Sequence, residues 1–301
     1  MSEKEYIVET LDPKDFDEWV EHCAAVFNFN YAAEYFRRHF MADPYRDYKS
    51  VFIIKDNNKI VSTVRVFHRQ VYLGGKIYKM GGIGEVSTNI NYRRLGLSYK
   101  LMAAATEYMQ ENGFYLSMLG TGYYGHYEKH GFKCANYYGK TVSADLAPGA
   151  ADIRALNFDN FHEMAELYDK YCSNSNCCIA RTKEYWQSWC AGEIKNPHGL
   201  FIDNKLAGYI CFDGGRITEL VGDETLHDIL LSAAKPDDGK LETAKFIKTS
   251  RKVLKERTDT GTMVCLHKPV QINETVLQST DELVEYVNSH GGVNWWSHDG
   301  F

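Results

Sequence analysis

Residues 50–90 alternate between apolar and polar side chains over most of their length, and this run constrains the fold more than any other part of the chain. Turn signals at Asp56-Asn57-Asn58 and Gly74-Gly75 interrupt it, so it predicts strands joined by tight turns. A helical pattern follows over residues 95–111 and stops at Asn112-Gly113. The sequence therefore predicts an α/β (α+β) fold with a mixed sheet, in which a strand leads into a long helix.

The same pattern returns in the second part of the chain, after residues 145–150. The stretch "LFIDNKLAGYICF" echoes "VFIIKDNNKIVSTVRVF" as strand, Asn-containing turn and strand. A length of 301 residues also suggests two domains of ordinary size. We expect one domain over residues 1–147, a second of the same architecture over 148–270, and a C-terminal helix and tail over 271–301.

The composition limits the classes of function. Hydrophobic residues make up 44% of the chain and charged residues 25%, which favours packed cores over disorder. A net charge of −6 argues against nucleic acid as the main partner, because phosphate binding needs a basic surface. The polar start lacks the pattern of a secretion signal, and no apolar run reaches the roughly 18 residues that span a membrane. We expect a cytoplasmic protein without a membrane partner.

Four cysteines in the second half raise the question of a metal site: Cys172, Cys177, Cys178 and Cys190. Their spacing matches no paired C-x2-C motif, and they lie in a segment with a helical pattern. The eight cysteines of the chain are spread out as reduced thiols usually are. We therefore expect buried thiols and no metal.

Arg93, Arg94 and Gly96 stand where the strand gives way to the helix. A helix N-terminus carries unpaired N–H groups and a partial positive charge, so it attracts anions. Gly96 has no side chain to block a phosphate, and the arginines add positive charge. This pattern predicts a site for a diphosphate, although an ordinary helix start with solvated arginines would read similarly.

The order and spacing of these residues resemble the GNAT superfamily of acyl-CoA N-acyltransferases. In that family a strand precedes the motif [QR]-x-x-G-x-[GA], which corresponds here to residues 93–98, with Ser98 in place of the usual Gly or Ala. The resemblance covers residues 1 to about 145, and it implies acetyl-CoA as cosubstrate. It implies that the pyrophosphate is held by Arg93, Arg94, Leu95, Gly96, Leu97 and Ser98, and that the pantetheine pairs with Val86, Ser87 and Thr88.

The family also places an aromatic motif, Y-x-x-x-G-[FY], about 30 residues after this glycine, and Tyr127 to Phe132 match it. The resemblance implies that Tyr127 returns a proton to the leaving thiolate: a tyrosine has a reference pKa of about 10, and the thiol that forms has one of about 8.5. A backbone N–H near Val86 to Thr88 would stabilise the oxyanion. The alternative for Tyr127 is a packed aromatic, and Tyr123 and Tyr124 lie one turn away.

The two-copy layout resembles the tandem-GNAT group of enhanced intracellular survival (Eis-like) acetyltransferases. In that group the second domain is degenerate and lacks the pyrophosphate motif, as here, and the C-terminal carboxylate acts as base. The resemblance assigns that role to the carboxylate of Phe301, beside Trp295 and Trp296. The group carries a third domain of roughly a hundred residues where this chain has a short tail. The alternative bases are Glu85 and a water chain, and the alternative for the tail is packing on the surface.

Together these features predict an N-acetyltransferase that moves an acetyl group from acetyl-CoA to a primary amine by direct attack. The acceptor would be a small molecule or a peptide, and its identity stays open. A longer-chain N-acyltransferase and a non-catalytic acyl-CoA-binding protein are the alternatives. The sequence allows a homo-oligomer but does not specify one.

Overall fold

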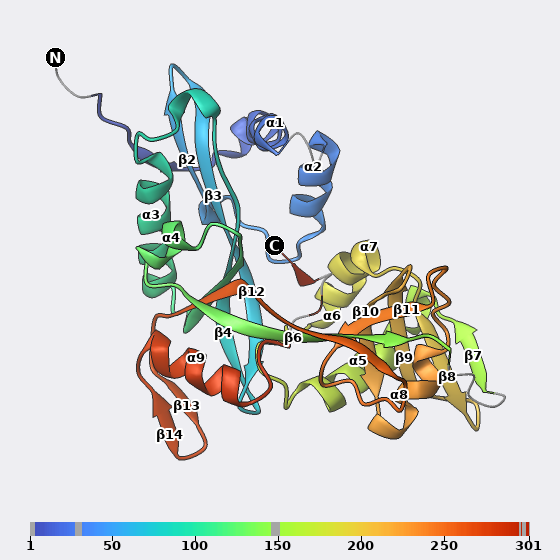
Figure 1. The fold of residues 1–301 in the computed structure, drawn as a ribbon. Helices are drawn as coiled ribbons and strands as arrows, with labels where there is room; N and C mark the ends of the chain where they lie inside the picture. The colour runs from blue at the N-terminus through green and yellow to red at the C-terminus, as the bar shows by residue number, and fades with distance from the viewer. Residues whose placement is uncertain (1–3, 28–31, 146–150, 295, 297–298, 301) are drawn as a thin grey trace.

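One 12-stranded sheet runs through the described part of the chain in the order β1-β2-β3-β4-β5-β12-β6-β11-β10-β9-β8-β7 (Figure 1). The computed structural model describes residues 4–27, 32–145, 151–294, 296, 299 and 300. The sheet contains both parallel and antiparallel pairs, and helices pack against it. The mixed α/β fold predicted from the sequence is therefore confirmed.

The strands of this sheet are β1 Val8–Thr10, β2 Val51–Asp56, β3 Lys59–Leu73, β4 Lys76–Thr88, β5 Leu116–Gly120, β6 Lys133–Ser143, β7 Asp152–Ala155, β8 His198–Ile202, β9 Lys205–Asp213, β10 Arg216–Gly222, β11 Lys240–Ala244 and β12 Val253–Leu266. A separate hairpin joins β13 Val270–Ile272 and β14 Thr275–Leu277. The α-helices are α1 Phe16–Val26, α2 Ala33–Ala42, α3 Leu97–Glu111, α4 Tyr124–Glu128, α5 Phe161–Cys172, α6 Lys183–Tyr185, α7 Ala191–Glu193, α8 His227–Leu231 and α9 Thr280–Ser289.

The two halves of the sheet have the same pattern of strand pairing. Strands β1 to β4 are antiparallel neighbours and β4 pairs in parallel with β5; strands β7 to β10 repeat this arrangement and β10 pairs in parallel with β11. Both halves contain a hairpin whose two turn residues have positive φ: Asn57 and Asn58 between β2 and β3, and Asp203 and Asn204 between β8 and β9. Such turns match the twist of the flanking strands. The repeat predicted from the sequence is present in the backbone.

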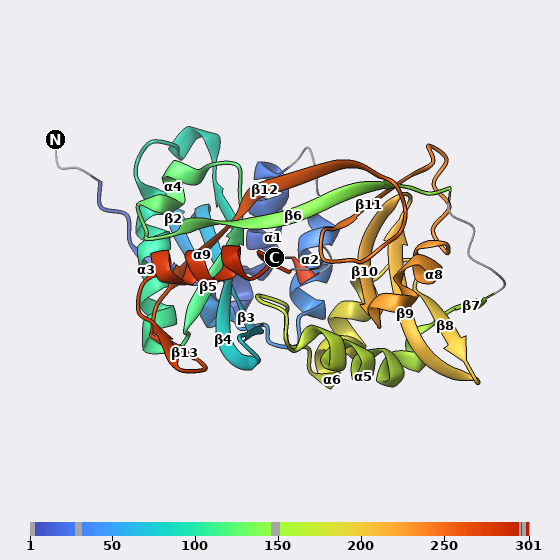
Figure 2. The ribbon, with the colours of Figure 1, turned by 60° about the horizontal axis from the view of Figure 1, so that its bottom comes forward.

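The middle of the sheet is made by an exchange of strands between the halves. β6 follows β5 along the chain but pairs with β11, whereas β12 follows β11 and pairs with β5. β6 and β12 also pair with each other. Figures 1 and 2 show both strands crossing from one half to the other. The predicted boundaries at residues 147 and 270 remain predictions, and β12 contributes to both halves.

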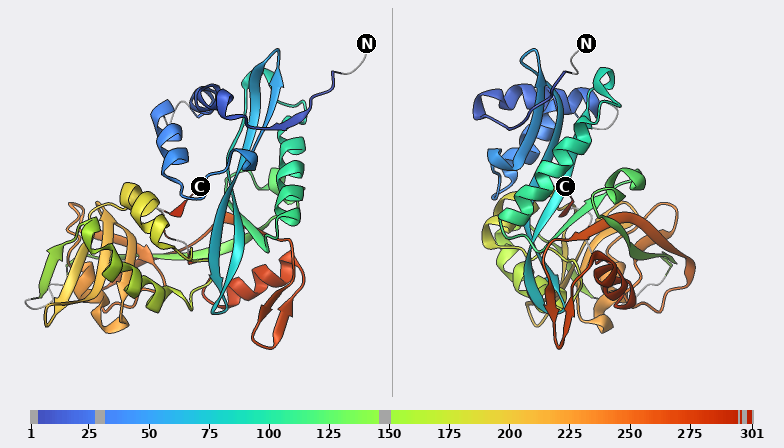
Figure 3. Two further views of the ribbon diagram at one scale, coloured as in Figure 1. Left: turned by 180° about the vertical axis from the view of Figure 1, so that it is seen from behind. Right: turned by 90° about the vertical axis from the view of Figure 1, so that its left-hand side faces the viewer.

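Helices cover both faces of the first half of the sheet. In Figure 3, α1 and α2 lie on one face and α3 lies on the other. The apolar stripe of α3 is buried, and its Met109 packs so closely on β4 that a Cβ at Gly81 would lie 2.3 Å from the Met109 sulfur. The glycine-rich part of β4 therefore serves helix packing, because only glycine admits so close an approach.

Several elements were not expected from the sequence: β6, β7, β11 and the β13–β14 hairpin. The described cysteines are free, and Cys172, Cys177, Cys178 and Cys190 are buried. Within the described residues no three His, Cys, Asp or Glu side chains gather as metal ligands would. In the same residues no helix is long and apolar enough to cross a bilayer.

Candidate active site

The strands β4 and β5 separate part-way along their length. They pair in parallel only where Met80 to Gly82 lie beside Leu116 to Met118. Beyond Gly82, β4 continues to Thr88 along β3 alone, and β5 ends at Gly120. The sheet is therefore open between residues 83–88 of β4 and the end of β5, and an extended ligand can pair with backbone groups there.

A β-bulge at Glu85 bends β4 at this opening. The pairing with β3 shifts between Thr63 and Arg65, where β4 has one extra residue. Glu85 adopts φ 53°, a left-handed conformation that is uncommon for a residue with a side chain. The bulge lies in the stretch of β4 that no longer pairs with β5.

The N-terminus of α3 faces the same region. Gly96 is its N-cap, with φ 74° and no side-chain hydrogen bond to the first turn. A Cβ built on Gly96 would meet nothing within 4 Å, so the space in front of this backbone is open. The first N–H groups of the helix have no intrahelical partner and remain available to an anion.

A cavity of about 660 Å³ joins the opening to this helix end. Its described lining contains three cations, Arg93, Arg94 and Lys129, and no carboxylate, although the whole chain has a net charge of −6. The remaining lining residues are Val26, Phe27, Val86, Ser87, Thr88, Tyr92, Gly96, Leu97, Ser98, Tyr99, Tyr123, His126 and Tyr127. The local charge therefore suits a ligand with several negative charges.

Most of the site residues predicted from the sequence lie around this one cavity. They are Val86, Ser87 and Thr88 on β4, Arg93, Arg94, Gly96, Leu97 and Ser98 at the start of α3, and Tyr127 on α4. Leu95 is the exception, because its side chain is 51% exposed and does not line the cavity. The structure thus brings two separate motifs together, while the role of each residue stays a prediction.

Ser98 takes part in a contact that the sequence did not indicate. Its hydroxyl lies 2.9 Å from Nε2 of His126, so it joins the first turn of α3 to α4. Burial lowers the pKa of His126, with a smaller contribution from Lys129, so the imidazole is neutral near pH 7. We infer that the serine at this motif position, where the family has Gly or Ala, holds α3 and α4 together.

Tyr127 is almost completely buried, at 9% exposure, and still reaches the cavity. Its ring contacts His126 and Phe132 edge-on. Burial raises the pKa of Tyr127 to about 12, so its phenol keeps its proton over the whole physiological range. No described residue is a hydrogen-bond partner of the Tyr127 hydroxyl, which leaves it available to a ligand.

Phe301, the predicted carboxylate base, and Trp295 lie outside the described residues. Asp299, two residues earlier, is completely buried. Nε and Nη2 of Arg181 donate to its two carboxylate oxygens at 3.1 and 2.7 Å, and the Tyr185 hydroxyl donates to it at 3.2 Å. This part of the tail therefore packs inside the molecule, rather than on its surface.

A second buried ion cluster lies behind the opening, and the sequence analysis did not find it. Arg65 and Arg69 of β3 both donate to Asp43, and Nη1 of Arg65 lies 3.4 Å from Oε1 of Glu85. The guanidinium of Arg69 also lies over the Tyr185 ring, at 5.1 Å from its centre. Two arginines four residues apart on one face of an apolar strand were the available signal. Contacts thus lead from Asp299 to Tyr185 and on to Arg69. Arg69 and Arg65 share Asp43, and Arg65 contacts Glu85 at the bulge.

Comparison with known families identifies the first half. Residues 8–135 match the model of the acetyltransferase (GNAT) domain. This range contains both motifs and the opening between β4 and β5. Residues 8–135, which are less than half of the chain, are thus similar to a GNAT domain. No curated protein matches the sequence.

Solved structures extend the likeness to most of the chain. A GCN5-related N-acetyltransferase from Kribbella flavida is similar over 87% of this chain and 71% of its own, with a TM-score of 0.68 and 14% identity. Another, from Anabaena variabilis, covers 87% of this chain and 73% of its own, with a TM-score of 0.69 and 13% identity. Eis1 from Mycobacterium abscessus covers 88% and 74%, with a TM-score of 0.61 and 11% identity. At these identities the likeness concerns the fold, which includes the second half as well as the GNAT domain.

Proposed function

We propose that the protein is an N-acetyltransferase that moves the acetyl group of acetyl-CoA to a primary amine. One observation carries this proposal: a single cavity with three cations and no described carboxylate joins the open edge of β4 to the uncapped start of α3. The match of residues 8–135 to the GNAT domain model supports the same function. The match to this domain supports acyl transfer in general, and the choice of acetyl as the acyl group is part of the proposal.

Acetyl-CoA would be held by backbone and charge. The N–H groups after Gly96 would bind the pyrophosphate, assisted by Arg93 and Arg94, because oriented backbone dipoles and guanidinium groups both favour phosphate. Val86, Ser87 and Thr88 would pair with the pantetheine amides along the free edge of β4. Leu95 would contribute its backbone alone, since its side chain points to solvent.

The reaction is direct attack of a neutral amine on the thioester carbon. A C–N bond forms, the carbonyl oxygen becomes an oxyanion, and collapse of the intermediate breaks the C–S bond. A backbone N–H between Val86 and Thr88 would stabilise the oxyanion. Tyr127 would give its proton to the thiolate, and the base would take the proton that the attacking amine loses. The base then releases that proton to solvent and Tyr127 regains one from solvent, so no proton is gained or lost over a turnover. The raised pKa of Tyr127 keeps this proton available at neutral pH.

The Phe301 carboxylate is the proposed base. The buried position of Asp299 supports it, because the tail is anchored by Arg181 two residues before the terminus. Desolvation would raise the pKa of such a carboxylate toward the range in which it can accept a proton. Glu85, which is buried at the bulge, is the residue to test next if the terminus is dispensable.

Titration calorimetry with CoA, followed by a free-thiol release assay with acetyl-CoA and a panel of primary amines, tests the proposal. We expect binding of one CoA per chain and amine-dependent release of thiol. Octanoyl- and myristoyl-CoA in the same assay separate a longer-chain acyltransferase. Binding without release for every amine and acyl chain would leave a non-catalytic acyl-CoA-binding protein, and the absence of binding would remove the function altogether.

A further inference from the structure

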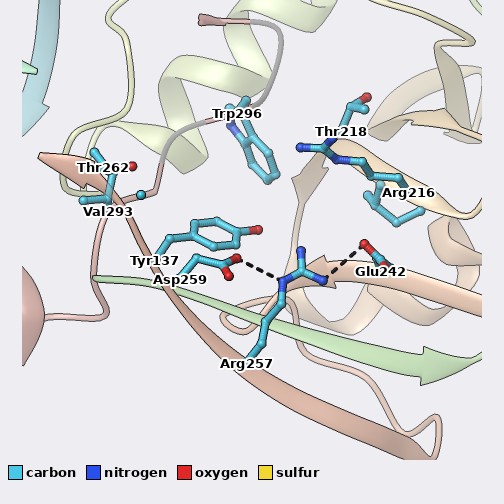
Figure 4. A pocket seen from close by; sticks show the side chains of 11 residues that line it. Tyr137, Arg216, Thr218, Glu242, Arg257, Asp259, Thr262, Val293 and Trp296 are labelled. Atoms are coloured by element: carbon cyan, nitrogen blue, oxygen red, sulfur yellow. Dashed lines mark hydrogen bonds and ion pairs between the residues drawn. The ribbon is translucent and has the colours of Figure 1, made fainter. Parts of the chain in front are cut away.

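A second, smaller cavity of about 230 Å³ lies where the two halves of the sheet meet (Figure 4). Strands β6 and β12 provide one side of it, strands β10 and β11 provide another, and Val293 and Trp296 of the tail complete it. Its volume is below the roughly 300–1,000 Å³ of pockets for drug-sized ligands. It is large enough for one end of a small molecule.

The lining of this cavity holds hydrogen-bond donors without acceptors. Among the described residues, the buried Nε1 of Trp296 and the buried hydroxyl of Thr218 have no hydrogen-bond partner. Arg216 reaches the cavity and takes part in none of the ion pairs found between described residues. In Figure 4, Arg216, Thr218 and Trp296 lie on one side of the cavity. Buried polar groups usually have a partner, so the Trp296 N–H and the Thr218 hydroxyl favour a ligand that hydrogen-bonds to them, and the exposed guanidinium of Arg216 lies beside them.

The two acids of the lining are already engaged. Arg257 donates to Glu242 at 3.2 Å and to Asp259 at 3.1 Å, and Figure 4 shows this bridge on the side opposite Trp296. A guanidinium that bridges two carboxylates satisfies much of their hydrogen-bonding capacity. Arg216 is the cation of the described lining that makes no ion pair with a described residue, although it is the direct neighbour of Glu242 across the β10–β11 ladder.

Aromatic rings make the cavity narrow. The Trp296 ring is 5% exposed and is fixed edge-on against Phe246, with 5.6 Å between the ring centres. Tyr137 lines the cavity beside Asp259, its direct neighbour across the β6–β12 ladder. Flat, rigid walls with donors at one end suit a planar anionic group such as a carboxylate.

The far end of this cavity lies close to the GNAT site. Gly261 and Thr262 line it, and Thr262 pairs with Gly120, the last residue of β5. The Thr121 N–H donates to the Gly261 carbonyl at 2.7 Å, and the chain from Thr121 leads into α4, which carries Tyr127. One strand thus separates this cavity from the opening where the thioester would lie.

We propose that this cavity binds a carboxylate of the acceptor through Arg216, Thr218 and Trp296, and that the substrates are small amines that carry a carboxylate. The inference rests on the proposed function, because it assigns the acceptor of that reaction. The carboxylate occupies the Arg216 end, and the amine extends past Gly261 and Thr262 toward the opening between β4 and β5. The acceptor is thereby selected by its anionic end, in a part of the molecule that residues 8–135 do not contain.

Calorimetry on the CoA-saturated protein tests this inference with matched pairs of ligands: glycine and glycinamide, β-alanine and β-alaninamide, and lysine and lysinamide. We expect at least one acid to bind about tenfold or more tightly than its amide, since a hydrogen bond to a charged group contributes that much. Arg216→Gln should abolish this preference. Trp296→Phe, which keeps an aromatic side chain, smaller than the indole, and removes the N–H, should reduce it.

Arg154→Gln is the control, because Arg154 is exposed on β7 and pairs with Asp152. It should retain the preference. CoA binding is measured for every variant and should not change. If no acid binds better than its amide, or if Arg216→Gln keeps the preference, the carboxylate site is refuted while CoA binding keeps the transferase proposal intact. If CoA itself does not bind, the proposed function fails first.

Discussion

The two halves of the molecule pass from strand to helix in different ways. At the β4–α3 junction the N-cap is Gly96, no side chain caps the helix, and α3 continues for 15 residues. Both strands are followed by a 3-10 turn with a side-chain cap: Asn89 caps Ile90–Tyr92 after β4, and Asp223 caps Glu224–Leu226 after β10. After β10 the turn runs directly into the five-residue α8, whereas after β4 it ends before Gly96 and α3 begins separately. The first junction therefore presents a free helix start, and the second presents a capped 3-10 turn that continues into its helix.

This difference explains how one backbone can serve two purposes. Asp223 and Glu224 put negative charge at the helix end where an anion would otherwise bind. The second half also has no counterpart of α4 among the described residues 245–252, which join β11 to β12. In the proposed function, a phosphate site thus depends on the backbone and the charges at the junction, while the strand pairing is the same in both halves. In our proposals, the second half shapes the acceptor side.

The largest effect should come from separating the halves. A fragment of residues 1–147 contains β6 but lacks β12, which pairs with β5 in the whole chain. Without it the central strands have unpaired edges, so we expect no cooperative thermal transition and no heat with CoA. Circular dichroism melting and calorimetry measure both. Co-expression with residues 148–301 should restore them, whereas a fragment that melts cooperatively alone and binds CoA would show that the halves are independent.

Next in size is the loss of the Tyr127 hydroxyl, which has no counterpart between β11 and β12. Tyr127→Phe should lower kcat about a hundredfold or more, as general acids typically contribute, and leave CoA binding unchanged. Because burial raises the pKa of Tyr127 to about 12, deprotonation of this group should not reduce kcat at any pH up to about 10. Tyr124→Phe is the control in steady-state assays, since Tyr124 does not line the cavity. Equal rates in the two variants would exclude Tyr127 as the acid.

A moderate effect is expected from a side chain at the open junction. Gly96→Ala places a Cβ in the space in front of α3, and we expect CoA to bind about tenfold more weakly. Gly214→Ala is the matched control, because Gly214 also has positive φ, at 56°, and also has nothing within 4 Å of a built Cβ. Both variants should lose about 1 kcal/mol of stability, and only the first should lose affinity. Similar CoA heats in both would argue against phosphate binding at Gly96.

The smallest effect concerns the closed junction. Asp223→Ala removes the side-chain cap of the 3-10 turn and should lower the melting temperature slightly. The hydrogen bond from Thr225 lowers the pKa of Asp223, so the charge is present at neutral pH. This variant should gain no second CoA site, because the helix that follows is too short and Glu224 remains. A second binding event in calorimetry would mean that Asp223 alone closes the junction.

Local signals in the sequence were sufficient for the first junction. Arg93 and Gly96 can be read from their place between a strand and a helix, and the turns at Asn57 and Asn204 from their side chains. The position of β12 between β5 and β6 could not be read, because strand order depends on partners far apart in the chain. For the same reason the contacts of Arg65 with Asp43, and the assembly of Arg216 with Trp296, became visible only in three dimensions.

The exchange of β6 and β12 has a consequence for synthesis on the ribosome. β6 begins at Lys133 and β12 begins at Val253, so 120 residues separate the starts of these two strands. At about 5–20 residues per second, β5 and β6 wait roughly 6–24 s for the strand that will lie between them. During that interval the nascent chain exposes strand edges that can pair with other chains, so we expect cells to need chaperones for this protein most when translation is slow.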